Sequence, residues 1–540
     1  MRLTKQFAEK LSLALHRRRI RHGIVMLDSV ETELQRIGPD TPNSARLLLL
    51  LAQWIDLGYR DYRFLDPLLA QFQSADRKKL NLEDYLQLRM AEAFRGLASG
   101  ECDACIEALD FVLKSLNDIG EGPQLALAHF WKGRAHRKMG QYEAAVSHIV
   151  RARELAQAQS DRMFTAIIQV QESWLLFQKS MTRDALQVLS KAEFVLKNTD
   201  HYVARGNIES ARGRIVRRQG EYTNALEHFT RAMELYARRD INHLNLARTL
   251  VNAAHVQRLL SLQIQNRIDR QARTGRSRSG ASKTAAISSE ALRLRYQELS
   301  QEALENLNRA REIYDLHRYG DGVGKVTLNL GYLHLDRGDI ERASLEAAEA
   351  YRIGQEQGDK ILMARARILG VSIENAHVEE QTGEDADVAV HANRAREYSE
   401  EALALAHATQ NLRLLASACI ARGMTAANDF FQDWEEARKR AGEATGLIGA
   451  GDNDHIVEDL SVLKSRIVQA SGINDTLRGW SEGMLGNKTF QQITEEFAEI
   501  VIPKVWMREG RKISRVAARL SISPRKVRRI LRNAGSIRRS

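Results

Sequence analysis

The chain has 540 residues, which is long enough for several domains or for one extended array. Only six residues are proline and 6% are aromatic, whereas Ala, Leu, Arg, Glu and Gln are abundant, and this composition favours an all-α protein. No run of about eighteen apolar residues occurs and the N-terminus lacks a signal-peptide pattern, so we expect a cytoplasmic protein that contacts no membrane.

Three cysteines provide no disulfide framework and are typical of a reducing compartment. Cys102 and Cys105 form a C-x-x-C pair, but no second pair and no nearby histidine cluster completes a zinc site. Cys105 also falls on a small-residue packing position of the repeats described below. We therefore expect these cysteines to be structural, with neither a metal nor a cofactor.

Residues 1–81 have helical patterns without a clear repeat. The apolar stretches at 45–57 and 65–72 predict buried helices, which would cap the open end of a helical array. A basic run near the start, His16 to Arg19, is interpreted as a solvated helix face. The segment is therefore predicted to be an N-terminal helical cap.

Internal repeats dominate the middle of the chain. Residues 126–159 and 206–239 align over their whole length, and five small or aromatic positions coincide: Gly133 with Gly213, Gly140 with Gly220, Tyr142 with Tyr222, Ala145 with Ala225, and Ala152 with Ala232. This spacing is that of the tetratricopeptide repeat, a helix-turn-helix unit of about 34 residues. The small residues let paired helices approach closely, and Gly140 opens the turn between them.

Weaker copies of the same pattern continue on both sides, so that about eight repeats cover residues 82–470. This span resembles tetratricopeptide-repeat proteins, and the resemblance implies a right-handed helical solenoid; a generic helical bundle is the alternative. Two insertions interrupt it, near 260–300 and 376–392. Residues 270–284 are rich in Ser, Gly and Arg and are predicted to be disordered between two extended helices, and the acidic stretch 379–387 is predicted to be a solvated loop.

A solenoid of this kind has a long concave groove that commonly accepts an extended peptide or a partner helix. The first helix of each repeat normally lines the groove, and Asn and Arg there suit peptide backbone and carboxylate groups. Any one of these residues could equally belong to an ordinary solvated helix surface. The predicted groove residues are His129, Lys132, Asn207, Arg214, Asn245, Arg248, Asn252, Asn329 and Tyr332.

Residues 471–488 contain four glycines and are predicted to be a linker between the array and the C-terminal segment. Residues 503–540 then contain thirteen Lys or Arg and a single acid, a net charge of +12, whereas the whole chain carries +11. The basic character of the protein is therefore a property of this tail, which is where a polyanion should bind.

Two short helical patterns meet at a tight corner in the tail. Ile513, Val516, Ala517 and Leu520 share one helical face, and Ser523 can cap a second helix whose first residue is Pro524. The second apolar face consists of Val527, Ile530 and Leu531. This arrangement predicts a helix-turn-helix.

The second helix presents arginines opposite its apolar face, where they could enter a DNA major groove. Arg525, Arg529 and Arg532 point directly away, and Lys526 and Arg528 flank them near the phosphates. The predicted DNA-binding set is completed by Ser523, Arg515 and Arg519. The alternative is a solvated basic helix that keeps the tail soluble.

The order of these features resembles the Fis-type helix-turn-helix domain of bacterial regulators, over roughly residues 489–537 of a predicted C-terminal domain at 489–540. The residues that carry the resemblance include Ile502, Val505, Gly510, the run 516–523, Val527, Ile530 and Leu531, preceded by an amphipathic helix with Phe490, Ile493, Phe497 and Ile500. The resemblance implies double-stranded DNA as a partner and suggests a homodimer. Ser521 occupies the corner where the family usually has Gly, so we expect a slightly strained turn.

No sequence pattern predicts catalysis. Residues 320–327 (GDGVGKVT) lack the first glycine and the Ser or Thr of a phosphate-binding loop, so we do not expect an enzyme. The sequence instead predicts a DNA-binding transcriptional regulator, in which a tetratricopeptide array binds a peptide or protein partner. The alternative is a non-catalytic scaffold whose basic tail contacts an acidic partner or RNA.

Overall fold

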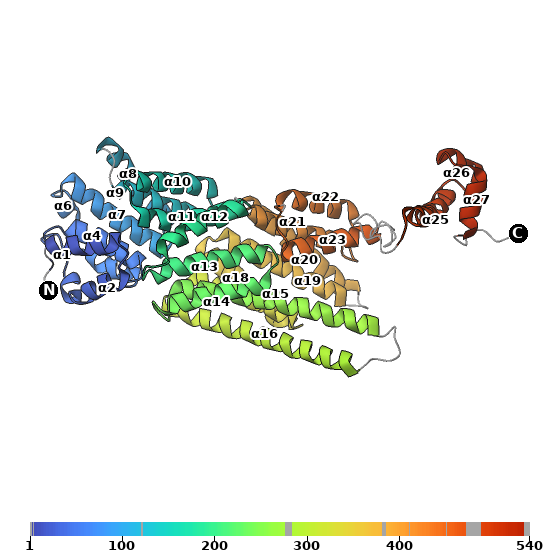
Figure 1. Cartoon of the computed structure of the whole chain (residues 1–540), viewed down its shortest axis with the longest axis horizontal. Helices are drawn as coiled ribbons and strands as arrows, with labels where there is room; N and C mark the ends of the chain where they lie inside the picture. Colours follow the sequence, from blue (N-terminus) through green and yellow to red (C-terminus); the bar gives the residue numbers. More distant parts are fainter. Residues whose placement is uncertain are drawn as a thin grey trace.

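The computed structural model describes residues 3, 5–119, 123–275, 283–380, 385–409, 411–449, 451–470 and 488–533. Throughout these ranges the regular secondary structure is helical, which confirms the all-α prediction (Figure 1). The N-terminal segment comprises short helices, namely α1 (Lys5–His16), α2 (Ile20–Asp28), α3 (Glu31–Leu34), α4 (Ser44–Asp56), η1 (Tyr62–Leu65), α5 (Asp66–Leu69) and α6 (Ser74–Arg77).

Antiparallel helix pairs follow from Leu82 onward, eight of them within the described ranges, and a single helix α23 (His455–Ala470) ends the array. The pairs are α7 (Leu82–Ser99) with α8 (Cys102–Ile119), α9 (Pro123–Lys138) with α10 (Tyr142–Ala158), α11 (Arg162–Gln178) with α12 (Thr182–Leu196), α13 (Tyr202–Arg218) with α14 (Tyr222–Ala237), α15 (Leu244–Gly275) with α16 (Lys283–Leu316), α17 (Gly320–Asp336) with α18 (Ile340–Gln357), α19 (Lys360–Glu380) with α20 (Asp385–His407), and α21 (Leu412–Ala426) with α22 (Trp434–Leu447).

Small residues allow the two helices of a pair to touch. A Cβ atom added to Gly133 would lie 2.8 Å from the Ile149 side chain, and one added to Gly213 would lie 2.6 Å from the Phe229 ring. Gly140 and Gly220 have φ angles of 76° and 81° in the turn between paired helices, a region that side chains disfavour. The residue types of the repeat pattern thus have the roles that the sequence predicts.

Helices α15 and α16 form a hairpin that extends beyond the other pairs (Figure 1). The prediction of disorder over 270–284 is wrong at both edges of the segment, because residues 270–275 are helical and α16 begins at Lys283. Each long helix supports the other, with Ile268 and Leu299 both buried. Residues 276–282 lie outside the described residues.

The second insertion differs from its prediction in the same way. Helix α19 continues to Glu380 and α20 starts at Asp385, so the flanks of the predicted loop 379–387 are helical, and residues 381–384 lie outside the described residues. The paired helices extend the repeat here as they do in α15 and α16.

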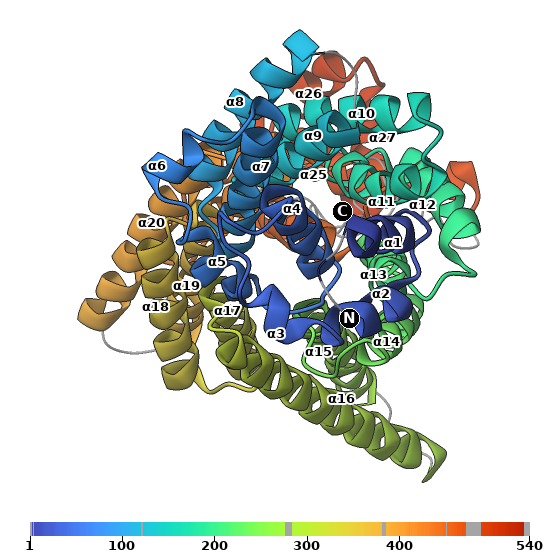
Figure 2. The same cartoon turned by 90° about the vertical axis from the view of Figure 1, so that its left-hand side faces the viewer.

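The array curves until distant segments meet (Figure 2). The backbone amide of Asn453, beyond α22, donates a 2.8 Å hydrogen bond to the Arg218 carbonyl at the end of α13. At the other end, the Ile20 amide donates to Asp200, also at 2.8 Å, and Arg239 donates to the carbonyl of Gly58. The N-terminal segment and the last repeats therefore both rest on the middle of the array.

A separate set of three helices forms the C-terminal segment: α25 (Phe490–Arg508), α26 (Ile513–Arg519) and α27 (Pro524–Asn533). We call it the C-terminal unit. Its small core is made of Ile502, Val516, Ala517, Val527, Ile530 and Leu531, all buried. The predicted glycine linker, apart from Lys488, lies outside the described residues.

Candidate functional site: a cationic channel and a basic helical unit

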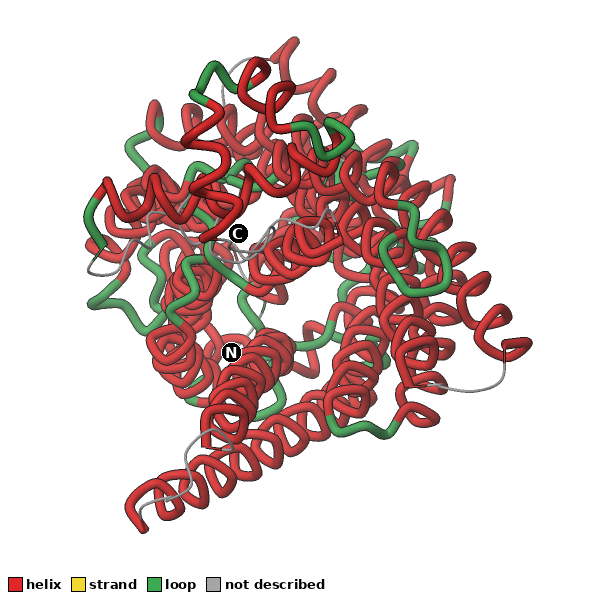
Figure 3. The backbone as a smooth tube through the Cα atoms, turned by 90° about the vertical axis from the view of Figure 1, so that its right-hand side faces the viewer, coloured by secondary structure: helices red, strands yellow, loops and turns green. Residues whose placement is uncertain are grey.

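A cavity of about 2380 Å³ lies inside the array. Figures 2 and 3 view the array from its two ends, and in both views the helices surround a central space. The first helix of each pair supplies most of the lining, together with parts of the N-terminal segment and α23. We call this cavity the channel. Its volume exceeds that of an ordinary small-molecule site, for which about 1000 Å³ is large.

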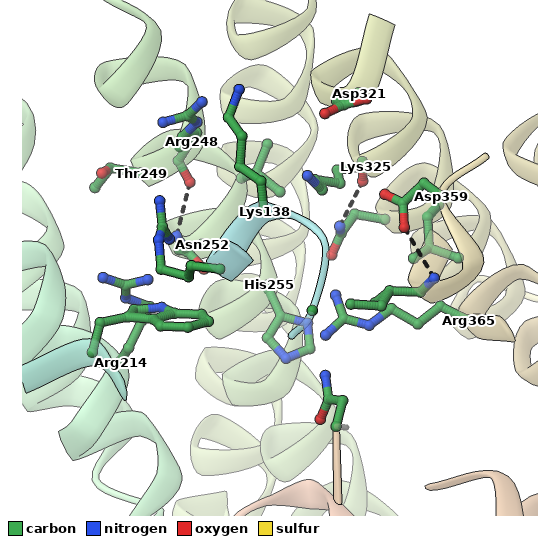
Figure 4. A pocket seen from close by; sticks show the side chains of 18 of the residues that line it. Lys138, Arg214, Arg248, Thr249, Asn252, His255, Asp321, Lys325, Asp359 and Arg365 are labelled. Carbon is green, nitrogen blue, oxygen red and sulfur yellow. Dashed lines mark hydrogen bonds between the residues drawn. The ribbon is translucent and has the colours of Figure 1, made fainter. Parts of the chain in front are cut away.

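Seven of the nine predicted groove residues line the channel: Asn207, Arg214, Asn245, Arg248, Asn252, Asn329 and Tyr332. They come from α13, α15 and α17, whose inner faces are brought together by the curvature of the array. Figure 4 shows Arg214, Arg248 and Asn252 facing the same space as Lys325 and Arg365.

Of the predicted groove residues, His129 and Lys132 do not line the channel. The Nδ1 atom of His129 lies 2.8 Å from Nδ1 of His148 on α10, and Lys132 forms an ion pair with Asp110 on α8. The channel-facing residues of α9 include Arg134, and Lys132 is about 200° around the helix from it. The packing of α9 between its neighbours fixes this rotation.

Several lining residues were not predicted from the sequence, although a signal for them exists. Arg134, Arg137 and Lys138 of α9 line the channel together with Arg217 and Arg218 of α13. In the alignment of the two best repeats, Arg134, Arg137 and Lys138 coincide with Arg214, Arg217 and Arg218. Recurrence of basic residues at equivalent positions would have identified this face.

The channel lining is cationic. Fifteen Lys or Arg and eleven Asp or Glu side chains line it. Some of these cations are neutralised locally: Arg134 pairs with Asp56, Arg258 with Asp336, and Arg413 with Asp452 and Asp454. Others have no carboxylate within ion-pair distance among the described residues, namely Arg137, Lys138, Arg214, Arg217, Arg248, Arg318, Lys325, Lys360 and Arg365.

Five of these arginines lie close enough to influence one another or a shared neighbour. Arg248 donates hydrogen bonds to Asn245 and Tyr319, and we call the other four, Arg137, Arg214, Arg217 and Arg365, the arginine cluster. Burial in the channel lowers the pKa of Arg137, Arg214 and Arg217 to about 10, and neighbouring guanidinium groups contribute to the shift. Burial, with Arg217 nearby, also holds the pKa of His255 well below its usual range. The arginines stay protonated at neutral pH, and His255 is neutral.

Two nitrogen atoms in the arginine cluster lack a partner. The Nε atoms of Arg137 and Arg217 are both buried, and neither has a hydrogen-bond acceptor in the described part of the chain. The Arg137 guanidinium instead rests over the Trp174 ring, 5.0 Å from its centroid. A buried donor without an acceptor is costly, so this part of the channel is suited to an anionic or carbonyl-bearing ligand.

The C-terminal unit exposes all the residues of the predicted DNA-binding set, namely Arg515, Arg519, Ser523, Arg525, Lys526, Arg528, Arg529 and Arg532. The Ser523 hydroxyl accepts a 3.2 Å hydrogen bond from the Lys526 amide, so it caps α27 as expected. Arg519 pairs with Glu509, and Arg529 lies 3.9 Å from Glu495. Ser521 has a φ of 51°, which agrees with the strained turn that its replacement of Gly implies.

The amphipathic character predicted for α25 is only partly seen. Ile493 and Ile500 are partly buried, but Phe490 is 85% exposed and Phe497 49% exposed. The core of the unit is filled from Ile502 onward, so the first half of α25 extends past its partner helices. These two phenylalanines form an uncovered apolar face.

All three cysteines lie on helices of the array, in α8 and α21. Cys102, Cys105 and Cys419 are buried and free, and burial raises the pKa of Cys105 to about 12. Over the described residues there is no group of His, Cys, Asp and Glu side chains able to hold a metal ion. Among the same residues, no helix is long and apolar enough to cross a bilayer.

Comparisons with known proteins agree with the repeat pattern. A tetratricopeptide-repeat family model matches residues 205–263, and no curated protein matches the sequence. Among solved structures, a Rap protein complexed with competence and sporulation factor has a TM-score of 0.51 at 13% identity, covering 78% of this chain and 100% of that one.

Two further solved structures have lower scores. The apo form of the quorum sensor NprR from B. thuringiensis has a TM-score of 0.48 at 13% identity, covering 74% of this chain and 98% of that one. A Rap conjugation gene regulator in complex with a Phr peptide has a TM-score of 0.42 at 13% identity, covering 75% of this chain and 96% of that one. The family match identifies tetratricopeptide repeats at residues 205–263, and the Rap structure with a TM-score of 0.51 shows that the all-α array has a similar fold.

Proposed function

We propose that the protein is a DNA-binding regulator of transcription, in which the C-terminal unit binds double-stranded DNA and the channel of the array binds a peptide or protein partner. The observation that carries the proposal is the division of α26 and α27 into two faces. Their apolar residues are buried in one core, while every basic residue of the predicted set is exposed. Such a surface suits the DNA backbone and the guanine edge.

The channel supports the second half of the proposal. Its size and its lining of Asn, Arg and apolar side chains suit an extended peptide. The Rap protein of similar fold was crystallised with competence and sporulation factor. A ligand that binds better to one arrangement of the array would change DNA affinity by linkage, provided that the two arrangements also differ in their affinity for DNA.

The DNA-binding half is tested by fluorescence anisotropy with a labelled duplex, over a series of salt concentrations. The full-length protein should bind with a steep salt dependence. Replacing Arg525, Arg529 and Arg532 with Ala should weaken binding and relax any base preference, whereas replacing the flanking Lys526 and Arg528 with Ala should reduce the salt slope by about 2. A matched variant with Arg183, Arg238 and Arg394 replaced by Ala should bind normally, since these exposed residues lie on the outside of the array.

Two outcomes would contradict this proposal. A chain ending at Ala470 that binds the duplex as well as the full-length protein would remove the C-terminal unit from DNA recognition. The second outcome is a tail variant that keeps its DNA affinity and loses only an acidic protein partner or structured RNA. That result would support the scaffold interpretation instead.

We also propose that a second copy of the chain covers the exposed face of α25. Phe490 and Phe497 are too exposed to contribute to the core of one unit, and the Fis-type resemblance suggests a dimer. Sedimentation equilibrium tests this: Phe497→Ala should weaken self-association, whereas Phe194→Ala, at an array residue that is 68% exposed, should leave it unchanged. A monomeric native protein would contradict the proposal.

A further inference from the structure

The charge pattern in the channel is more specific than peptide binding requires. A groove that recognises only peptide backbone needs neutral amides, and Asn207, Asn245, Asn252 and Asn329 supply them. The arginine cluster adds guanidinium groups from three elements, α9, α13 and α19, to the same space. Such groups repel one another, so their convergence lowers the stability of the empty protein and calls for a compensating anion.

The unsatisfied atoms of the cluster point to the same conclusion. The Nε atoms of Arg137 and Arg217 are buried without an acceptor, and no carboxylate of the described chain pairs with Arg214 or Arg365. Figure 4 shows Arg214 and Arg365 on opposite sides of the channel, with His255 between them. A carboxylate between these groups could accept hydrogen bonds from more than one guanidinium fork.

The surroundings favour an acidic peptide over a nucleic acid. Base recognition in a channel relies on free aromatic faces, but guanidinium groups already cover three lining rings. Arg137 lies over Trp174, Arg248 over Tyr319 and Arg258 over Tyr332, at 5.0, 5.4 and 4.7 Å from the ring centroids.

Acidic and apolar side chains share the lining. Asp321, Asp359 and Asp459 would repel a continuous row of phosphates. Apolar side chains in the lining provide contacts for peptide side chains instead, among them the partly exposed Ile167, Ile361 and Ile368.

We infer that the ligand of the channel is a peptide bearing an acidic group, an Asp or Glu side chain or a C-terminal carboxylate. The arginine cluster holds this carboxylate, and the Asn side chains hold the peptide backbone. This inference rests on the proposed function, because it names the chemical class of the partner in the array. Arg137, Arg214, Arg217 and Arg365 are then the residues that set specificity.

The experiment uses the full-length chain with Arg525, Arg529 and Arg532 replaced by Ala, so that the basic tail does not capture anionic probes. Three fluorescein-labelled probes are compared by anisotropy: hexaglutamate, C-terminally amidated hexaglutamine and single-stranded hexathymidylate. Into this background we place the channel changes Arg214→Gln, Arg217→Gln and Arg365→Gln. A matched variant carries Arg183→Gln, Arg238→Gln and Arg394→Gln on the outside of the array.

Hexaglutamate should bind the background protein at least about tenfold more tightly than hexaglutamine or hexathymidylate. The channel changes should weaken the binding of hexaglutamate by about tenfold or more, and the matched changes should leave its affinity unaltered. Replacing the same three arginines with Lys keeps the charge and loses the fork, so it should give an intermediate affinity. Circular dichroism verifies that each variant is folded.

Equal binding of hexaglutamate before and after the channel changes would overturn the inference, as would the absence of hexaglutamate binding at millimolar concentration. Tighter binding of hexathymidylate than of hexaglutamate would assign the channel to nucleic acid instead. None of these results affects DNA binding by the C-terminal unit, which is measured separately on the protein with its tail intact. Failure of this inference is therefore distinguishable from failure of the proposed function.

Discussion

The amide of Asn453 donates a 2.8 Å hydrogen bond to the carbonyl of Arg218, and this contact joins the last repeats of the array to its middle. The Arg218 side chain lies 3.9 Å from Asp452, and Arg413 pairs with both Asp452 and Asp454. These two arginines and two aspartates are all largely buried, so solvent and salt screen their charges little. The contact lies beside Arg217 of the arginine cluster, whose charged neighbours include Asp454 and Arg413.

The contact between Asn453 and Arg218 can be tested at Gly220, which has a φ of 81° and faces the loop that carries Asn453. A Cβ atom at Gly220 would lie 2.4 Å from the Asn453 carbonyl oxygen, whereas one at Gly140 would lie 3.8 Å from Ile361. Both substitutions to Ala carry similar backbone strain, about 1 kcal/mol. Only Gly220→Ala should also displace the loop, which would accelerate amide hydrogen exchange over residues 451–455 and raise the radius of gyration in solution scattering.

Identical exchange in the Gly220→Ala and Gly140→Ala variants would show that the loop does not depend on this contact. Because the two glycines occupy equivalent turns of two repeats, the comparison cancels the strain and leaves the contact as the difference.

A second prediction concerns the stability of the protein without ligand. Arg217 has a buried Nε without an acceptor, and burial together with the nearby Arg413, Arg214 and Arg365 outweighs its attraction to Asp454. Arg217→Gln should therefore stabilise the fold by about 1 kcal/mol. Arg258→Gln should destabilise it by about 3 kcal/mol, because it would leave Asp336 buried without its 2.9 Å partner. Urea unfolding measures both changes.

The two variants are matched because both residues are channel-lining arginines on first helices of the array. Destabilisation by Arg217→Gln similar to that of Arg258→Gln would mean that the arginine cluster is a structural feature and not an unsatisfied binding site.

The stability should also depend on pH through buried imidazoles. Burial lowers the pKa of His129, His148 and His243 to about 4, and that of His201 and His455 to about 3. As the pH falls, the unfolded chain therefore binds protons at these imidazoles before the folded chain does. The stability that is present above about pH 6.5 is lost as the pH falls toward the folded-state pKa values of the imidazoles. The urea midpoint should decrease steadily from about pH 7 to about pH 4.

His201→Asn isolates one of these groups. His201 accepts a hydrogen bond from the Ala204 amide at the start of α13, and Asn retains a capping oxygen without a titrating proton. The variant should show a shallower loss of stability in acid. His22→Asn, at an exposed position, should leave the slope unchanged, and equal slopes in all three proteins would contradict the prediction.

In the C-terminal unit, Ser521→Gly should relieve the left-handed backbone at the corner between α26 and α27. Ser521 has a φ of 51°, and its exposed side chain makes no hydrogen bond among the described residues. The change should therefore slow amide hydrogen exchange of residues 513–531 by the equivalent of about 1 kcal/mol. Ser523→Ala removes the α27 cap and should accelerate the same exchange by a similar amount. A change of the same sign in both variants would contradict this account.

The sequence by itself determined the local structure. Glycines at 133, 140, 213 and 220 recur at a fixed spacing because each pair needs a close contact and a left-handed turn, and both requirements are local. The cap at Ser523 and the strained corner at Ser521 are predictable for the same reason. The concentration of positive charge in the tail is a property of composition alone.

Only the tertiary structure decided which side chains meet in the channel. Helical periodicity places Lys132 and Arg134 on different faces of α9, but the rotation of α9 between α8 and α10 determines that Arg134 and Arg137 face inward. The convergence of Arg137, Arg214 and Arg365, and the contact of Asn453 with Arg218, depend on the curvature summed over successive repeats. That curvature arises from small packing differences at every interface between helix pairs, and no short stretch of sequence contains it.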